Sequence, residues 1–423
     1  MIQLSLLRNE PEKIIERLSI KNIDASAQVK EILSIDDERR ATQKKLDDNL
    51  AESNLIAKEV GELFRSGKTQ EANILKEKTV DLKKNAKELE EKLSGLESEL
   101  NNLLVLLPNP PHISVKKGKT PEDNEIVGTH GEIPLLPEDA LPHWELAAKY
   151  DLIDFELGNK ITGAGFPVYK GKGAKLQRAL INFFLDSAIE KGYNEIQPPL
   201  MVNEASAYGT GQLPDKDGQM YFVQKDNLYL IPTAEVPVTN LYRDVILKEK
   251  DFPVKNTAYS SCFRREAGSY GKDVRGLNRL HQFDKVEIVQ IQHPDKSYET
   301  LEEMREYVSG LLRTLELPYR ILKLCGGDMS FTSALTYDME VYSAAQKRWL
   351  EVSSVSNFES YQANRMKLRY KAENGKIFFC HTLNGSALAL PRIVASLLEN
   401  NQMPEGIKIP KALQKYTGFE IID

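Results

Sequence analysis

Apolar residues in the first quarter of the chain recur at alternating intervals of four and three, the spacing of helices that pack along one stripe. Two long helices are predicted, near residues 26–65 and 69–107, because few helix breakers fall within either range. Residues 66–68 leave room only for a tight reversal, and Thr69 is a candidate cap of the second helix. The stripe of the second helix comprises Leu75, Thr79, Leu82, Ala86, Leu89, Leu93, Leu96, Leu100, Leu103 and Leu107.

The first helix carries a weaker stripe, which the polar run 36–45 interrupts. Together the two stripes predict an antiparallel coiled-coil hairpin, called the arm below, with a length of about 55 Å at a rise of about 1.5 Å per residue. Taken by itself, such a hairpin suits self-association as well as binding to another molecule. The weaker stripe comprises Val29, Ile32, Leu46, Leu50, Ile56, Val60 and Leu63.

The run 108–111, which contains three prolines, ends the arm, because proline lacks the amide hydrogen and restricts the residue before it. Beyond it, short apolar strands alternate with helices, which predicts an α+β domain built on antiparallel strands. We therefore expect two domains, residues 1–108 and 109–423. The predicted strands include 228–231, 280–291, 377–380 and 388–390, and the predicted helices include 174–191, 298–315 and 392–400.

Composition and charge narrow the possible classes of function. The formal net charge is −6, so any nucleic-acid binding must rest on a local basic patch. The three cysteines are isolated and expected to be buried apolar residues, and the histidines lack the spacing of zinc ligands, so neither disulfides nor zinc are expected. We see neither a transmembrane stretch nor an apolar signal sequence, which favours a cytoplasmic protein without membrane contact.

Residues 263–287, FRREAGSYGKDVRGLNRLHQFDKVE, read as a hairpin with a glycine-containing charged loop. Alternation along the first strand would place Arg264 and Glu266 on one face. Such a hairpin offers a guanidinium for a phosphate, an aromatic ring for a base and a carboxylate for an amine or hydroxyl. Alone, it fits an edge hairpin with a solvated loop equally well. The residues sharing a face of the second strand would be His281, Phe283, Lys285 and Glu287.

Three shorter segments are candidates for a polyphosphate and a small polar substrate. In a strand, Glu351 and Ser353 would share one face, and a carboxylate beside hydroxyls can hold magnesium, although a solvated strand end is the simpler explanation. Thr233 and Glu235 could meet a substrate or merely cap a helix. Arg392 follows a proline at a predicted helix start, where anions are attracted.

Residues 258–287, 351–354 and 381–400 resemble motifs 2 and 3 and the intervening metal-binding strand of class II aminoacyl-tRNA synthetases, and the chain resembles the seryl-tRNA synthetase family in particular. The resemblance covers nearly the whole chain. Helix 174–191 and the strand to residue 199 resemble motif 1, which implies a homodimer. The other matching segments are LSLLRNEPEKIIERL, the arm, GTGQLP, TAE, EVSSVSNFESYQANR and HTLNGSALAL.

The resemblance implies a role for each matching residue. Arg264 and Arg392 would be catalytic, with Arg264 bridging the serine carboxylate and the ATP α-phosphate, and Phe283 would stack on adenine. Pro391 and Ala387 stand where many bacterial relatives have glycine, and both leave Arg392 in place. The implied ATP site comprises Arg264, Arg265, Glu266, Leu280, Phe283, Glu351, Val352, Ser353, Ser354 and Arg392; the serine site comprises Thr233, Ala234, Glu235, Glu287 and Ser386; Mg²⁺ would bind Glu351 and Ser354.

The resemblance further implies that the protein is a serine–tRNA ligase. It would activate L-serine with ATP to seryl-adenylate and transfer the seryl group to the 3′ end of tRNA(Ser), and of tRNA(Sec) where present. The arm would bind the tRNA, and residues 267–278 would meet its acceptor end. Two alternatives use the same fold: a ligase that charges a carrier protein, which the arm argues against, and an inactive paralogue acting as a binding module. The basic residues proposed to contact RNA are Lys58, Arg65, Lys68, Lys83, Lys84 and Lys87.

Overall fold

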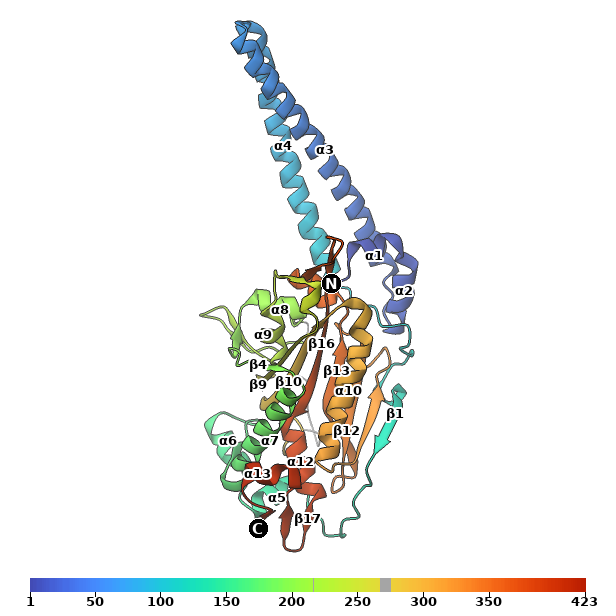
Figure 1. Ribbon diagram of the computed structural model, residues 1–423, viewed down its shortest axis with the longest axis vertical. Helices are drawn as coiled ribbons and strands as arrows, with labels where there is room; N and C mark the ends of the chain where they lie inside the picture. Colours follow the sequence, from blue (N-terminus) through green and yellow to red (C-terminus); the bar gives the residue numbers. More distant parts are fainter. Residues whose placement is uncertain (216, 267–274) are drawn as a thin grey trace. The chain divides into compact units, whose positions relative to one another are not determined.

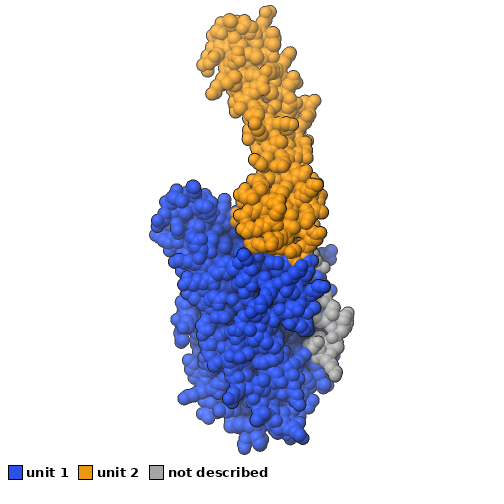
Figure 2. Space-filling model, turned by 90° about the vertical axis from the view of Figure 1, so that its right-hand side faces the viewer, with its two compact units in different colours: residues 1, 20–22, 109–423 blue, residues 2–19, 23–108 orange. Residues whose placement is uncertain are grey.

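The structure is a computed structural model that describes residues 1–215, 217–266 and 275–423. The chain forms two compact units, which Figure 2 colours separately. The first, called the sheet unit below, contains residues 1, 20–22 and 109–423; the second, the arm unit, contains residues 2–19 and 23–108. No helix among the described residues is both long enough and apolar enough to cross a membrane.

The arm unit contains the predicted antiparallel hairpin (Figure 1). It is formed by α3 (Ser26–Arg65) and α4 (Thr69–Leu104), preceded by α1 (Leu4–Asn9) and α2 (Pro11–Ile20). Every residue predicted for the stripe of α4 is buried or half-buried, which confirms the spacing argument. The predicted cap is wrong: Lys68 precedes the helix without a side-chain capping bond, and Thr69 is the first helical residue.

The stripe of α3 differs from its prediction at Leu50 and within the polar run 36–45. Leu50 is 41% exposed, so it lies outside the packed stripe. Within the polar run, Asp36 is fully buried and occupies a stripe position. Its carboxylate accepts hydrogen bonds from Arg8 Nη2 at 2.8 Å and Arg39 Nε at 3.1 Å, which compensate the cost of burying the charge.

The sheet unit is built on a mainly antiparallel sheet, as predicted. Among the described residues the sheet has eight strands in the order β1, β11, β12, β13, β16, β10, β9, β4. Only the short edge pair β4 and β9 is parallel among the pairings of these described strands. The strands are β1 (Glu125–His130), β11 (Tyr319–Lys323), β12 (Leu335–Ser343), β13 (Arg348–Asn357), β16 (His381–Ala389), β10 (Gln282–Gln292), β9 (Val254–Phe263) and β4 (Asn194–Glu195).

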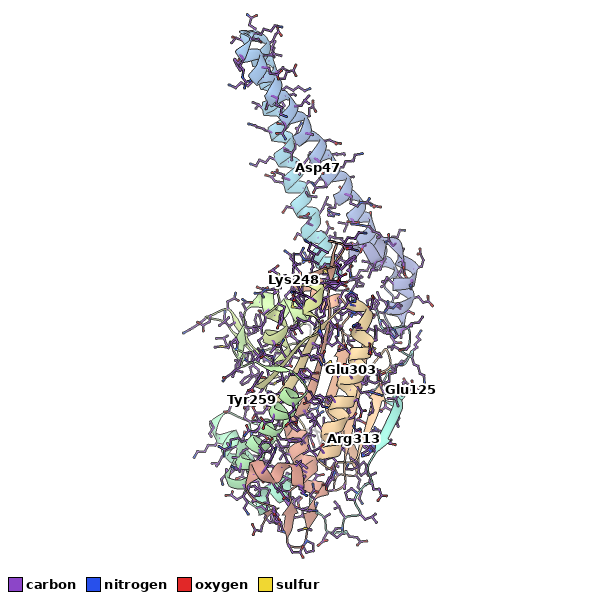
Figure 3. All side chains as sticks on the ribbon, in the orientation of Figure 1. Asp47, Glu125, Lys248, Tyr259, Glu303 and Arg313 are labelled. Atoms are coloured by element: carbon purple, nitrogen blue, oxygen red, sulfur yellow. The ribbon has the colours of Figure 1, made fainter. Side chains whose placement is uncertain are left out.

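Three helices, α7 (Gly171–Glu190), α10 (Ser297–Thr314) and α12 (Leu390–Asn400), pack on the sheet and close the main apolar core. Figure 3 shows the side chains over this fold, with Tyr259 on β9 and Glu303 and Arg313 on α10. Val286 and Ile288 of β10 belong to this core, whereas Val289 joins a separate cluster with Ala234 and Val238. Because side chains alternate along a strand, the face opposite the helices carries Lys285 and Glu287.

Shorter elements surround the sheet. The predicted strand 388–390 does not form separately, because β16 continues to Ala389 and α12 begins at the next residue. The three cysteines are buried and unpaired, as expected. The remaining elements are α5 (His143–Lys149), β2 (Ile153–Asp154), α6 (Phe155–Ile161), β3 (Val168–Tyr169), β5 (Met201–Val202), α8 (Glu204–Thr210), β6 (Phe222–Val223), β7 (Leu228–Leu230), α9 (Glu235–Asn240), β8 (Ile246–Lys248), α11 (Tyr361–Met366), β14 (Arg369–Lys371), β15 (Ile377–Phe379), β17 (Gln402–Met403), β18 (Gly406–Lys408), α13 (Lys411–Thr417), β19 (Ile421–Ile422) and the 3₁₀ turns η1 (Pro121–Asp123), η2 (Glu249–Asp251) and η4 (Pro294–Lys296).

Candidate active site

A cluster of buried polar side chains, called the polar cluster below, lies on the face of the sheet opposite the core helices. Glu287, which is 1% exposed, stands directly across from Ser386 of β16 in the strand pairing. Its Oε2 accepts a hydrogen bond from Thr233 Oγ1 at 3.0 Å and pairs with Lys285 Nζ at 2.5 Å. A carboxylate held by one hydroxyl and one ammonium keeps further acceptor capacity for an amine or a hydroxyl of a ligand.

Glu235 is the second acidic residue of the polar cluster. Its Oε1 accepts a hydrogen bond from Gln362 Nε2 at 2.7 Å, and Gln362 Oε1 accepts one from Thr382 Oγ1 at 2.7 Å. Burial, together with the nearby charge of Glu287, raises the pKa of Glu235 from 4.5 to about 7. The polar cluster therefore combines the paired carboxylate of Glu287 with the carboxyl group of Glu235, which holds its proton near neutral pH.

Arg264 and Phe283 lie beside each other where β9 and β10 meet. The Arg264 guanidinium carbon is 5.3 Å from the centre of the Phe283 ring, which is cation–π geometry. β9 ends at Phe263 and β10 begins at Gln282, so the alternation predicted for Arg264, Glu266 and His281 is wrong. A backbone hydrogen bond from Arg264 to His281 at 2.9 Å nevertheless holds the two segments together.

The remaining residues of the predicted nucleotide site lie around this pair. Glu266 accepts a hydrogen bond from Arg279 Nη1 at 3.0 Å, and Arg265 lies over the Tyr221 ring. Leu280 is 4% exposed, so burial holds it in place. Each of these residues is therefore oriented by a contact or by burial before any ligand binds.

A β-bulge in β13 determines which of its side chains face a polar cavity beside the strand. Asp338 stands opposite Ser354, and Glu340 opposite Glu351, with one extra residue on β13 between these pairs. The prediction that Glu351 and Ser353 share a face is therefore wrong. Glu351 and Ser354 line the cavity together, Val352 joins the apolar core, and Ser353 Oγ donates to Ser386 O at 2.6 Å.

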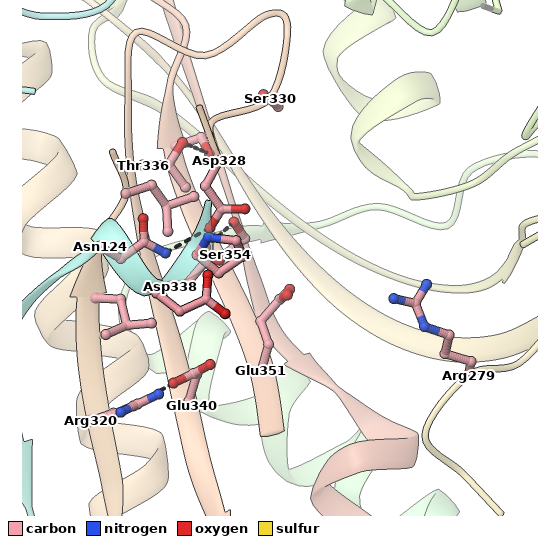
Figure 4. A pocket seen from close by; sticks show the side chains of 15 residues that line it. Asn124, Arg279, Arg320, Asp328, Ser330, Thr336, Asp338, Glu340, Glu351 and Ser354 are labelled. Atoms are coloured by element: carbon pink, nitrogen blue, oxygen red, sulfur yellow. Dashed lines mark hydrogen bonds and ion pairs between the residues drawn. The ribbon is translucent and has the colours of Figure 1, made fainter. Parts of the chain in front are cut away.

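The cavity has a volume of about 600 Å³ and is lined by several carboxylates and hydroxyls (Figure 4). Ser354 Oγ donates to Asp338 Oδ1 at 2.5 Å. Burial and the neighbouring Glu351 charge raise the pKa of Asp338 well above its usual value. The lining residues include Asn124, Arg279, Arg320, Asp328, Asp338, Glu340, Glu351, Ser354 and Ser356.

The oxygen ligands of the cavity suit Mg²⁺ better than zinc, because magnesium prefers carboxylate and hydroxyl oxygens. Within the described ranges, however, no group of three His, Cys, Asp or Glu side chains is arranged to hold a metal ion. Glu351 and Ser354 would thus hold a Mg²⁺ ion only with oxygens from water or a bound phosphate, which is how Mg²⁺ accompanies nucleotides.

Arg392 connects α12 to the cavity. Its Nη1 donates to Glu351 O at 2.6 Å and its Nε to Asn278 O at 3.2 Å, and Nη1 lies 3.8 Å from Glu351 Oε2. α12 begins at Leu390, so Pro391 lies within its first turn, where proline is tolerated. The structure therefore brings Arg392 and Glu351 together, although 41 residues separate them.

Sequence reasoning missed three residues of these networks. Alternation predicts the correct face for Lys285 but no role, and no sequence pattern predicts Asp338 or Gln362. The signal for Lys285 was its position two residues before Glu287 in a strand. Asp338 and Gln362 gave no comparable signal, because their partners lie 16 and 127 residues away in the chain.

Comparison with known proteins gives the same family over the whole chain. Residues 1–111 match the model of the seryl-tRNA synthetase N-terminal domain, and residues 221–401 match the class II tRNA synthetase core domain (G, H, P, S and T). The chain is 53% identical over 421 residues to the serine–tRNA ligase of Salinibacter ruber, covering 99% of this chain and 98% of that protein.

Solved structures agree with the sequence comparison. The seryl-tRNA synthetase of Pyrococcus horikoshii, complexed with ATP, is 34% identical with a TM-score of 0.92 and covers 100% of this chain and 99% of that one. The cytoplasmic serine–tRNA ligase of Naegleria fowleri, in complex with AMP, is 27% identical with a TM-score of 0.88, with the same coverage. With matching fold, full-length relatives and a buried polar cluster on the strand that carries the aromatic ring of an arginine–aromatic pair, the chain belongs to the seryl-tRNA synthetase family of class II aminoacyl-tRNA ligases.

Proposed function

We propose that the polar cluster binds L-serine and that the cavity lined by Glu351 and Ser354 binds ATP, so that seryl-adenylate forms between them. The placement of Arg264 carries this assignment. Its guanidinium stacks on Phe283, and its positive charge acts against the burial that raises the pKa of Glu235. Arg264 directly follows β9, and the partner strand β10 carries both Phe283 and Glu287, so the aromatic surface for adenine and the groups for serine lie on one strand. ATP in the Pyrococcus horikoshii neighbour supports the nucleotide half of the proposal.

In the first step, the serine carboxylate attacks the α-phosphorus of ATP and pyrophosphate leaves. The carboxylate is already a nucleophile, so positioning and charge stabilisation are the contributions required of the protein. Arg264 holds the carboxylate against the α-phosphate, and Arg392 stabilises negative charge on the departing phosphates. Glu351 and Ser354 would hold Mg²⁺, which would neutralise phosphate charge when bound. Phe283 stacks on adenine and Glu266 reads its amino group.

Serine is recognised by the groups around Glu287. We assign its amine and hydroxyl to Glu287, Thr233 and Ser386, with Glu235 and Ala234 completing the site. A site built to bond a hydroxyl rejects alanine strongly, because buried polar groups would lose their partner. The Thr233–Glu287 bond at 3.0 Å shows that these groups are already oriented toward each other.

In the second step, the terminal ribose hydroxyl of tRNA(Ser), and of tRNA(Sec) where that tRNA exists, takes the seryl group. Residues 1–108 would form the tRNA-binding domain and 109–423 the catalytic domain. The six basic arm residues named above are all exposed, which supports contact with an RNA backbone. Residues 267–278 would meet the acceptor end; 267–274 lie outside the described residues. We further infer a cytoplasmic homodimer.

Serine-dependent ATP–pyrophosphate exchange, measured with a panel of amino acids, tests the first step. Serine should support exchange and alanine should not. Arg264→Lys should lose most of this exchange, because one ammonium cannot make the planar two-pronged contact. Near-normal exchange by that variant would remove Arg264 from its assigned role.

Deletion of residues 30–104 tests the second step. Serine-dependent pyrophosphate exchange should survive the deletion while charging of tRNA(Ser) collapses, because serine activation would use only the sheet unit. Persistence of both reactions would refute RNA binding by the arm. Transfer of serine to a carrier protein instead of tRNA would favour the alternative ligase.

A further inference from the structure

A histidine–glutamate pair lies buried outside the proposed substrate sites. His143, the first residue of α5, and Glu399, near the end of α12, are both fully buried. His143 Nδ1 lies 2.6 Å from Glu399 Oε1, and the backbone amide of His143 donates to the same oxygen at 2.9 Å. A charged carboxylate is buried at this depth only where several donors compensate its lost hydration.

The contacts of the ring determine its protonation. The backbone N–H of Leu277 donates to His143 Nε2 at 2.8 Å, so Nε2 carries no proton. The imidazole is therefore neutral, with its hydrogen on Nδ1 and directed at Glu399. Burial would raise the pKa of Glu399, but hydrogen bonds from His143 and Ser343 hold it below the usual value.

The ring fixes the chain segment 275–278, which leads from the predicted loop into β10. Gly276 has a φ of +67°, and a Cβ at that position would lie 2.2 Å from His143 Nε2. Leu277, which bonds to the ring, is 1% exposed, and Arg275 lies 4.8 Å from the centre of the Trp144 ring. The segment is thus held by α5 through a hydrogen bond, a close backbone approach and a cation–π contact.

A second path leads from the same pair to Arg392. Gln346 Nε2 donates to Glu399 Oε1 at 2.9 Å, and Gln346 Oε1 accepts from Asn278 Nδ2 at 3.1 Å. The carbonyl of Asn278 then accepts the bond from Arg392 Nε at 3.2 Å. Since α12 carries both Arg392 and Glu399, the bonds close a ring that begins and ends on one helix.

We propose that His143 and Glu399 are positioning residues for ATP activation, which clamp residues 275–278 against α12 and thereby orient Arg392. The proposal rests on the ATP-binding role assigned to Arg392 above. Arg392 has a long flexible side chain, and a fixed carbonyl at Asn278 removes the rotamers that point away from the cavity. Catalytic groups need such support from residues that do not touch the substrate.

Two substitutions at His143 separate positioning from simple core stability. The longer side chain in His143→Gln places an amide oxygen near the Nε2 position and can still accept from Leu277, whereas the shorter one in His143→Asn places its amide near Nδ1 and cannot. We expect His143→Asn to raise the KM for ATP in pyrophosphate exchange about tenfold, by the usual effect of losing a supporting contact. The KM for serine should stay near that of the unmodified protein. His143→Gln should restore most of the ATP affinity.

Gln346→Leu provides a variant outside the deepest core, because Gln346 is only half-buried. It cuts the path to Asn278 and should also raise the KM for ATP selectively. His381→Gln is the control: His381 is a half-buried histidine bonded to Ser297 Oγ at 2.8 Å, and its loss should lower Tm without a selective change in ATP binding.

The proposal is overturned if His143→Asn and Gln346→Leu both keep the ATP KM of the unmodified protein. It is also overturned if, in these variants, the KM for ATP and the KM for serine rise equally while Tm falls as it does in the control. If His143→Asn does not fold, Gln346→Leu alone decides. Arg392→Ala separates the two levels of inference. If Arg392→Ala leaves the ATP KM unchanged, the assigned role of Arg392 fails; if it raises the ATP KM while the network variants do not, only the positioning proposal fails.

Discussion

Replacing Glu235 with glutamine should stabilise the protein at alkaline pH while impairing serine activation. The folded protein raises the pKa of this carboxyl from 4.5 to about 7, so it binds the proton more tightly than the unfolded chain does. Stability therefore falls as pH rises from 4.5 to about 7. The difference between the two pKa values corresponds to about 3 kcal/mol, which Glu235→Gln should recover above pH 7. Below pH 4.5 the two proteins should be equally stable.

Thermal unfolding across the range pH 4.5 to 8.5 measures this effect, with serine-dependent exchange recorded on the same samples. Glu287→Gln is the control. Glu287 is also a buried carboxylate, but its replacement breaks the ion pair with Lys285, whose Nζ lies 2.5 Å from Glu287 Oε2. That variant should be destabilised by about 3 kcal/mol at pH 8. A stability difference for Glu235→Gln that does not change with pH, or that is a loss at pH 8, would refute the reasoning.

Three further expectations concern other parts of the chain. Gln362→Leu should raise the KM for serine more than that for ATP, since it removes the 2.7 Å bond that orients Glu235; equal changes would contradict this. Ser354→Ala should increase the Mg²⁺ concentration needed for half-maximal exchange, and an unchanged requirement would exclude Ser354 as a ligand. Asp36→Asn should lower the Tm of the whole chain, measured by circular dichroism. Arg8 and Arg39 hold the pKa of Asp36 below its usual value against the effect of burial, so this stability is present above pH 3.8 and is lost as pH falls through the lowered pKa.

The arm and the fold class could be predicted because they follow from local periodicity. The spacing of the α4 stripe fixes which side of that helix is buried, whatever lies elsewhere in the chain. The predicted burial of Leu50 is wrong because hydrophobicity alone does not decide which residues of a helix are buried. Asp36 is buried instead, because an arginine from α1 compensates its charge. Such compensation comes from tertiary structure and leaves no periodic signal.

The site residues came from resemblance, and strict alternation misplaced several of them. Arg264 lies one residue beyond the end of β9, so the period-two rule does not apply to it. The face of Glu351 depends on a bulge, which sequence alternation assumes to be absent. Gln362 supports the polar cluster from α11, which no local pattern connects to Glu235.

The extra residue in β13 also bears on how this strand tolerates changes of length. In a regular strand, losing one residue turns every later side chain to the opposite face. Here, deletion of Val352 would leave Glu351 and Ser354 two residues apart in a regular strand, and both would still face the cavity. The cost would be one buried valine, about 2 kcal/mol of apolar burial. Two different spacings, Glu-x-x-Ser with a bulge and Glu-x-Ser without one, therefore encode the same pair of ligands, and a search for this site by fixed spacing would find only one of them.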